Sequence, residues 1–110
     1  MAGFTLNDMK KFAKSGKAKK GTQRDRLYRG REGNEKDSNI VLYRVWDNLI
    51  AVYNYKTKQL TIKDAGYRTN LTKDRLNGVI PRGKGKIAQK KFKWYIGKQE
   101  WKGSKVYKRV

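Results

Sequence analysis

Cations and aromatic rings alternate near the C-terminal end of the chain, and these residue types are the best candidates in the sequence for binding a ligand. Three lysines interleave there with three aromatic residues: Lys90, Lys91 and Lys93 with Phe92, Trp94 and Tyr95. Lysines attract phosphates, while aromatic rings stack on exposed bases. The pattern therefore predicts a sheet face that binds nucleic acid through Lys90, Lys91, Lys93, Trp94 and Tyr95.

The same alternation has a purely structural alternative. An ordinary half-buried hairpin would turn Phe92, Trp94 and Ile96 inward and use the lysines to protect a sheet edge from other strands. The run contains more lysines than edge protection requires. Both interpretations of the aromatic residues stay open, and the lysines favour a binding role.

Two further basic segments have the composition to follow a phosphate backbone. Glycines space the cations Arg82, Lys84 and Lys86 and let the backbone approach a phosphate, although no nucleotide P-loop pattern is present. The N-terminal segment supplies ten more candidates: Lys10, Lys11, Lys14, Lys17, Lys19, Lys20, Arg24, Arg26, Arg29 and Arg31. The structural alternatives are a solvated tail over residues 14–21, and a segment that Leu27 and Tyr28 dock onto the sheet.

Composition indicates the class of partner. The 110 residues contain 29 Lys and Arg against 9 Asp and Glu, which gives a formal charge of +20 and a pI near 10.4. Self-repulsion at this charge destabilises a compact state unless a polyanion neutralises it. The expected partner is therefore nucleic acid, DNA or RNA, and less often an anionic membrane or an acidic protein.

The chain contains no histidine and no cysteine. This excludes disulfides, His-based acid–base catalysis and Cys nucleophiles, and it removes the preferred ligands of zinc. Asp64 and Asp74 are a candidate carboxylate pair across a turn, but Asp74 is better explained as first-turn charge on a helix. We expect no enzymatic activity, no cofactor and no metal.

Nothing in the sequence indicates a membrane or an export signal. No run approaches the ~20 apolar residues of a membrane span. Residues 1–12 lack the apolar centre of a signal peptide. We therefore expect a cytosolic protein without a membrane partner.

Charge divides the chain into three parts. Residues 1–31 carry ten basic and two acidic side chains, residues 32–81 eight and six, and residues 82–110 eleven and one. The near-neutral middle also holds the best core residues. We predict a basic N-terminal helix and flexible arm over residues 1–38, followed by a β-rich core domain over residues 39–110.

Local patterns predict the individual elements. Runs rich in β-branched and aromatic residues predict strands at 39–46, 49–55, 59–63, 87–92, 93–97 and 101–110. Apolar residues at near-helical spacing predict a helix at about residues 72–79, with Thr72 as its N-cap, Asp74 in its first turn and Pro81 beyond its end.

A second, short helix is predicted near the N-terminus, where Leu6, Met9 and Ala13 share one helical face and Thr5 or Asn7 is the cap. We expect this helix to be peripheral. Together the elements predict an α+β fold: a small twisted antiparallel sheet of five to six strands, open or curled into a partial barrel, with the 72–79 helix packed across it.

The segment from Gly66 to Asn77 reads GYRTNLTKDRLN. It resembles a segment of small, mostly uncharacterised bacteriophage-encoded proteins, in which a Gly-aromatic-Arg-Thr run leads into Thr-Lys-x-Arg-hydrophobic-Asn. The resemblance extends over about residues 40–97, and Leu71 stands where those proteins have the first residue of a Thr-Thr pair. It implies a phage origin and action in the cytoplasm of an infected bacterium or in the virion, and it carries over no functional residue.

The leading hypothesis is a non-enzymatic nucleic-acid-binding protein that contacts mainly phosphates and is weakly sequence-specific. The rival hypothesis is a phage interaction protein that inhibits a host enzyme or defence complex through its basic surface. A third is a structural phage component that contacts the packaged genome. Arg68, Lys73 and Arg75 would contribute under the first two hypotheses, unless they only solvate an exposed face.

Overall fold

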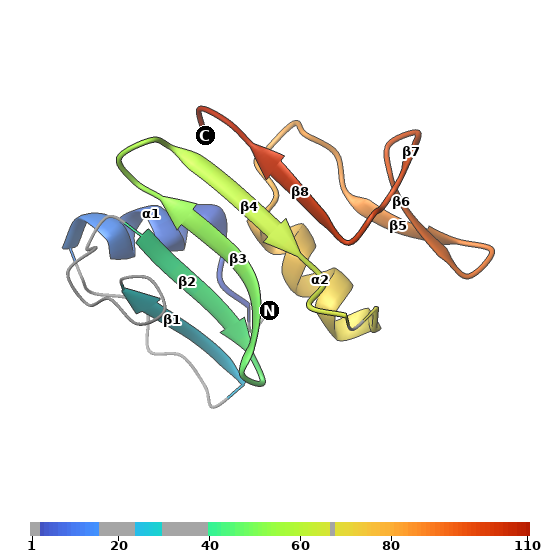
Figure 1. Ribbon diagram of the computed structural model, residues 1–110, viewed down its shortest axis with the longest axis horizontal. Helices are drawn as coiled ribbons and strands as arrows, with labels where there is room; N and C mark the ends of the chain where they lie inside the picture. The colour runs from blue at the N-terminus through green and yellow to red at the C-terminus, as the bar shows by residue number, and fades with distance from the viewer. Residues whose placement is uncertain (1–2, 16–23, 30–39, 67) are drawn as a thin grey trace.

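The computed structural model describes residues 3–15, 24–29, 40–66 and 68–110, with the backbone only for residues 15, 28 and 29. This part of the chain forms two helices and eight strands (Figure 1): α1 (Leu6–Ser15), β1 (Asp25–Arg29), β2 (Ile40–Val45), β3 (Asn48–Asn54), β4 (Gln59–Lys63), α2 (Asn70–Val79), β5 (Ile87–Lys90), β6 (Lys93–Ile96), β7 (Gln99–Glu100) and β8 (Ser104–Tyr107). The predicted α+β class is confirmed.

The strands divide between two open antiparallel sheets instead of forming one sheet or a partial barrel. The larger sheet has the order β1-β2-β3-β4-β8, and the smaller has the order β5-β6-β7. The predicted strands at 39–46, 49–55 and 59–63 are confirmed as β2, β3 and β4 to within one residue at each end. The segment around Leu27, predicted as part of a basic arm with docking onto the sheet as the alternative, is the edge strand β1, and Leu27 is opposite Tyr43 of β2.

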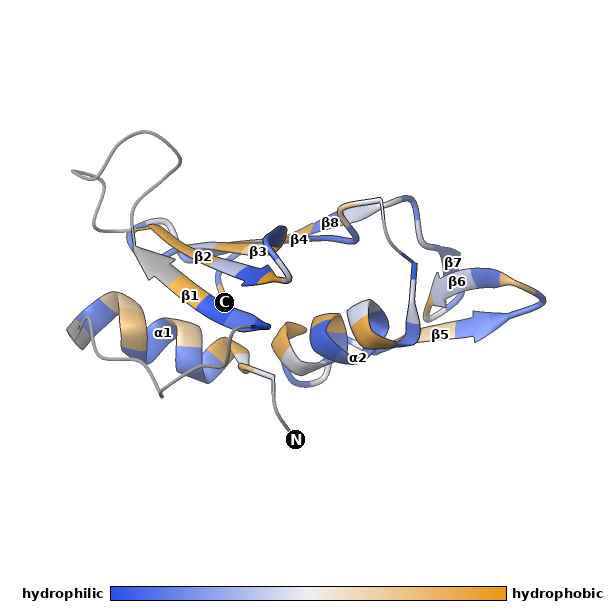
Figure 2. Ribbon diagram, turned by 90° about the horizontal axis from the view of Figure 1, so that it is seen from below, coloured by the Kyte–Doolittle hydropathy of each residue, from blue (hydrophilic) through white to orange (hydrophobic). Residues whose placement is uncertain are grey.

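Both helices lie on the same side of the larger sheet (Figure 2). The helix α1 packs against β1 and β2, whereas α2 packs against β3 and β5, and the two helices touch. The structure therefore has a sheet layer over a helix layer, with the smaller sheet beyond α2 at one end of the molecule.

The helix α1 begins with a reciprocal cap. The amide of Asp8 donates to the Thr5 hydroxyl at 3.2 Å, and the amide of Thr5 donates to the Asp8 carboxylate at 2.9 Å. The expectation that this helix is peripheral is wrong, because Leu6, Met9 and Ala13 are buried in the main hydrophobic core. An amphipathic stripe of three residues is enough to cover the end of the sheet.

The helix α2 starts two residues earlier than predicted. Its N-cap is Thr69, whose hydroxyl accepts from the Thr72 amide at 3.2 Å. Thr72 is thus inside the helix, and Asp74 lies beyond the first turn instead of in it. Leu76 and Val79 are fully buried and pack this helix into the core.

A buried ion pair joins the helix layer to the sheet layer. Arg75 of α2 donates from its Nε to the Asp25 carboxylate of β1 at 2.9 Å, and the Tyr43 hydroxyl donates to the same oxygen at 2.7 Å. The prediction that Arg75 is a surface cation is therefore wrong. The backbone of Gly3 packs directly against the Arg75 side chain: a Cβ at position 3 would lie only 2.6 Å from Arg75 Cδ.

The charges of this cluster stabilise one another. Burial alone would lower the pKa of the Arg75 guanidinium, but the hydrogen bond and charge of Asp25 reverse this and raise the pKa. Burial and the hydrogen bond to Asp25 raise the pKa of Tyr43 well above its ordinary value. The Tyr43 hydroxyl also accepts from the Phe4 amide at 3.1 Å, so the same cluster holds the start of the chain.

Candidate functional site

The predicted cation–aromatic segment forms the hairpin of β5 and β6, which projects at the end of the molecule away from β1 (Figure 1). In this hairpin Lys90 is directly opposite Lys93, and Ala88 is directly opposite Tyr95. Residues opposite each other, and those two positions apart along a strand, share a face. Lys90, Lys93 and Tyr95 therefore lie together on the outer face.

The other face of the hairpin is buried. It carries Ile87, Trp94 and Ile96, of which Trp94 is only 2% exposed. Adjacent strand residues point to opposite faces, so Trp94 and Tyr95 cannot both contact a ligand from one side. The prediction of Trp94 as a binding residue is wrong for this reason, and the half-buried-hairpin alternative is confirmed for Trp94 and Ile96.

The outer face is hollowed into a pocket of about 540 Å³, which we call the hairpin pocket. Tyr95, half-buried, forms part of its wall. The remaining described lining residues include Lys90, Lys91 and Lys98, and none of them is acidic. Like charges directly opposite each other, as at Lys90 and Lys93, destabilise a hairpin, and an anion bound between them would relieve that cost.

Phe92 occupies the tip of the hairpin and is 95% exposed. It forms a two-residue turn with Lys91, and both residues are left-handed, with φ of 52° at Lys91 and 67° at Phe92. The half-buried-hairpin alternative is therefore wrong for Phe92, which it placed inward. The sequence contains no signal for this turn, because such turns favour Asn-Gly and not Lys-Phe.

Two contacts fix the hairpin to the rest of the fold. The Asn77 side chain of α2 accepts from the Ile87 amide at 2.7 Å and donates to the Ile87 carbonyl at 3.1 Å, in the manner of a neighbouring strand. The Trp101 amide donates to the Trp94 carbonyl at 2.8 Å, and the Trp101 indole donates to the Asp64 carboxylate at 2.9 Å. The smaller sheet is thus held by α2 on one side and by the end of β4 on the other.

Asp64 is the buried acceptor in this connection. Burial alone would raise the pKa of its carboxyl group, but hydrogen bonds from the Gly66 amide, the Trp101 indole and Arg68 outweigh burial and lower the pKa. Arg68, another predicted surface cation, reaches Asp64 at 3.1 Å. Asp74, the candidate partner of Asp64 in a carboxylate pair, contacts Arg75 instead.

A second basic pocket, of about 430 Å³, lies where α1 meets the loop after α2; we call it the α1 pocket. Lys10 from α1 and Arg82 and Lys86 from the loop line it, so the fold brings together three predicted cations from distant parts of the chain. Lys86 in this pocket is only two residues from Ala88 in the hairpin pocket. The two pockets therefore follow one another along the segment that leads into β5.

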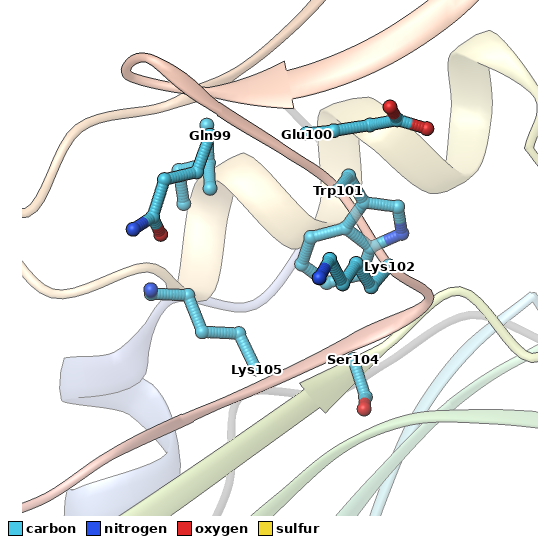
Figure 3. A pocket seen from close by; sticks show the side chains of 7 residues that line it. Gln99, Glu100, Trp101, Lys102, Ser104 and Lys105 are labelled. Carbon is cyan, nitrogen blue, oxygen red and sulfur yellow. The ribbon is translucent and has the colours of Figure 1, made fainter.

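A third pocket, of about 390 Å³, lies beneath the turn between β7 and β8. Figure 3 shows the side chains of Gln99 and Lys105 reaching toward the same space, with Glu100 pointing away from it. Glu100 is the one acidic residue between positions 82 and 110. Cations therefore outnumber acidic residues in the described lining of each of these three pockets.

A protein-family comparison identifies the chain. The family described as Kyanoviridae Gp96 protein matches residues 16–109. The chain belongs to this family. It is therefore a bacteriophage protein, and the match extends beyond residues 40–97, over which the sequence resembles phage-encoded proteins. No curated protein and no solved structure matches the chain.

The other predicted binding residues of this Gp96-family chain lie outside the two basic pockets or outside the described residues. Lys11, Arg26 and Lys84 are exposed, Lys14 lies 6.0 Å from the centre of the Tyr55 ring, and Arg24 contacts the Asp25 carboxylate at 3.4 Å. Several more lie outside the described residues: Lys17, Lys19, Lys20 and Arg31, with the side chain of Arg29. Among the predicted binding residues, Lys90, Lys91 and Tyr95 line the hairpin pocket, and Lys10, Arg82 and Lys86 line the α1 pocket.

Two kinds of feature can be assessed in the part of the chain that the structure describes: clusters of metal-ligating side chains and helices that could span a membrane. Its His, Cys, Asp and Glu residues form no group of three or more that could hold a metal ion. Neither of the two described helices is long and apolar enough to cross a membrane.

Proposed function

We propose that this Gp96-family protein binds nucleic acid in the infected bacterium, mainly through phosphate contacts and without catalysing a reaction. The observation that carries the proposal is the outer face of the β5–β6 hairpin. Lys90 and Lys93 face each other there, and Lys90, Lys91 and Lys98 surround Tyr95 in a pocket without a described acidic residue. A phosphate backbone supplies the charge that this face lacks, while the ring of Tyr95 is suited to a base.

The α1 pocket supports the same function. Lys10, Arg82 and Lys86 converge on it, and Lys86 places it next to the hairpin pocket. Arginine forks onto phosphate oxygens, and lysine binds them as a point charge. A strand of nucleic acid that follows residues 82–98 would meet both pockets in turn.

The salt dependence of binding tests the proposal. Phosphate contacts release counterions, so the affinity for duplex DNA should fall with a logarithmic slope of about −0.9 for each phosphate neutralised. Changing Lys90, Lys91 and Lys93 together to Gln should flatten that slope by about 0.9 for each lysine that contacts a phosphate. Fluorescence anisotropy with labelled DNA and RNA across a salt series measures both quantities.

A matched variant controls for net charge. Lys56, Lys58 and Lys108 are exposed but line neither basic pocket, so changing all three to Gln removes the same charge elsewhere. This variant should keep a steeper salt slope than the hairpin variant. A flat response of the unchanged protein to salt, or equal slopes for the two variants, would contradict the proposal.

A pull-down with the same purified protein distinguishes the proposed function from its rival. An inhibitor of a host enzyme or defence complex should retain one host protein from a nuclease-treated lysate, and should bind all nucleic acids weakly and alike. That result would replace the proposed function. A structural phage component would instead co-purify with virions.

A further inference from the structure

The tip of the hairpin presents a large apolar ring to solvent. Among the described residues, the exposed large hydrophobic side chains are Trp46, Phe92 and Val106, with 59%, 95% and 48% of their surface accessible. Burying an aromatic ring is among the largest stabilising contributions available to a side chain. Phe92 makes almost none of that contribution within its own chain.

The turn that carries Phe92 is also unfavourable for its residues. Left-handed backbone is rare for bulky residues, yet both Lys91 and Phe92 adopt it. Strained, exposed positions of this kind are concentrated at binding sites, where the strain serves to place a side chain. The turn of Trp46 and Asp47 has the same backbone, so Phe92 is distinguished by the greater exposure of its ring and by its neighbouring lysines.

Three lysines are neighbours of Phe92 in the hairpin, and their charges limit which partner the ring can contact. Lys90 and Lys93 close the strands below the turn, and Lys91 precedes Phe92 within it. An apolar protein groove would have to desolvate these charges. A nucleic acid instead offers phosphates to the lysines and the flat face of a base to the ring.

An anionic membrane offers negative charge as well, but the shape of the site argues against it. Tyr95 lies behind the tip in a pocket of about 540 Å³, which a flat bilayer surface cannot enter and a nucleotide can. Phe92 and Tyr95 are also separated by two residues, with Lys93 next to Phe92. Two rings with a cation between them match successive bases and the phosphate that joins them.

We propose that the β5–β6 hairpin recognises unpaired nucleotides, with Phe92 stacking on one base, Tyr95 contacting its neighbour, and Lys90 and Lys93 holding the intervening phosphate. This inference rests on the proposed nucleic-acid binding and names its substrate class. Bases in a duplex are already stacked on both faces, so a ring gains access to them only by unstacking. An unpaired base offers a free face without that cost.

The test compares Phe92→Ala with the unchanged protein on one labelled sequence, prepared as single-stranded DNA, single-stranded RNA and duplex DNA. Loss of one stacked base should weaken single-strand binding about 5- to 150-fold. Duplex affinity should change less than about twofold, and the salt slope should stay the same because no phosphate contact is removed. The DNA and RNA arms identify which single strand is preferred.

Two further variants keep the test decisive. Phe92→Trp preserves an aromatic ring and should retain single-strand affinity, whereas Trp46→Ala removes the exposed ring of another hairpin and should leave it unchanged. A 2-aminopurine base in the strand reports stacking directly: its fluorescence should be quenched by the unchanged protein and not by Phe92→Ala. Circular dichroism verifies that each variant is folded.

The outcomes separate this inference from the function on which it rests. If the unchanged protein binds no nucleic acid, the proposed function fails. If it binds but Phe92→Ala keeps full single-strand affinity, or loses duplex affinity equally, only the inference is overturned. Binding to phosphatidylserine vesicles that requires Phe92, without a single-strand effect, would overturn it in favour of a membrane surface.

Discussion

The two sheets of this phage protein use their residues in opposite ways. The five-stranded sheet has strands of four to seven residues and a helix layer against one face, and the buried side chains of these two layers together make up most of the core. The three-stranded sheet has strands of four, four and two residues, and only its inner face is buried. The five-stranded sheet with its helices, which we call the larger half, supplies most of the stability. The outer face of the three-stranded sheet, the smaller half, can therefore carry charged side chains.

Charge differs between the segment of the smaller sheet and the middle of the chain. Residues 82–100, which include the three-stranded sheet, carry seven cations and one acidic residue, whereas residues 32–81 carry eight and six. The strands of the smaller sheet have four, four and two residues, so this sheet depends on packing against the rest of the fold. It is stable here because Asn77, Trp94 and Trp101 attach it to the larger half.

The largest effect should come from breaking the buried ion pair of the larger half. Arg75→Met removes the buried guanidinium 2.9 Å from the Asp25 carboxylate, which is 0% exposed, and leaves the half-buried Arg24 at 3.4 Å. This change should lower the free energy of unfolding by about 3–5 kcal/mol. Urea unfolding monitored by circular dichroism measures the loss. Arg82→Met, the same change at an exposed arginine, should alter stability by less than about 0.5 kcal/mol.

A double variant distinguishes a lost charge partner from lost packing. Asp25→Asn combined with Arg75→Met removes both charges, and the asparagine oxygen still accepts from the Tyr43 hydroxyl. The double variant should therefore be more stable than Arg75→Met alone. If it is less stable, packing of the arginine stem and not its charge holds the two layers together.

An intermediate effect is expected where the two halves join. Trp101→Phe removes one hydrogen bond to the ionised Asp64, which should cost about 1.5–3 kcal/mol at pH 7. The pKa of Asp64 is lowered in the folded state, so its contribution to stability is full above the unfolded value of about 3.9 and is lost as pH falls through the folded pKa. The deficit of the variant should therefore shrink below about pH 4.

Urea unfolding at pH 7 and at pH 3 measures whether the stability deficit of Trp101→Phe shrinks as the pH falls. Trp94→Phe makes the same change of ring in the neighbouring buried indole, and its cost should not depend on pH. An equal deficit for Trp101→Phe at both values would mean that Asp64 does not gain stability from the indole. The connection between the halves would then depend on apolar packing alone.

The larger half was predicted from the sequence more accurately than the smaller half. Each wrong prediction has its own physical reason. β2, β3 and β4 are rich in β-branched residues and pair in order, so local propensity is sufficient to predict them. Arg75 looked like a surface cation because its partner Asp25 is 50 residues away. Trp94 and Tyr95 were both predicted to bind from their residue types, although they are neighbours in one strand and therefore point to opposite faces. The turn at Lys91 and Phe92 was missed because its residues are atypical of such turns.

The smallest expected effect on stability comes from changing a turn, and it can be compared between one hairpin of each half. Trp46 and Asp47 form a left-handed two-residue turn between β2 and β3, as Lys91 and Phe92 do between β5 and β6. Replacing either pair by Asn-Gly should stabilise the protein by about 0.5–2 kcal/mol, because Asn-Gly favours this backbone. Thermal unfolding measures the gain, and anisotropy measures single-strand binding.

The two replacements should differ only in binding. Asn-Gly at positions 91 and 92 removes the exposed ring and one lysine, so the gain in stability should accompany a loss of single-strand affinity. Asn-Gly at positions 46 and 47 should give a similar gain with affinity unchanged. If both variants bind as the unchanged protein does, the unfavourable residues of the β5–β6 turn serve no ligand, and the two hairpins differ in charge alone.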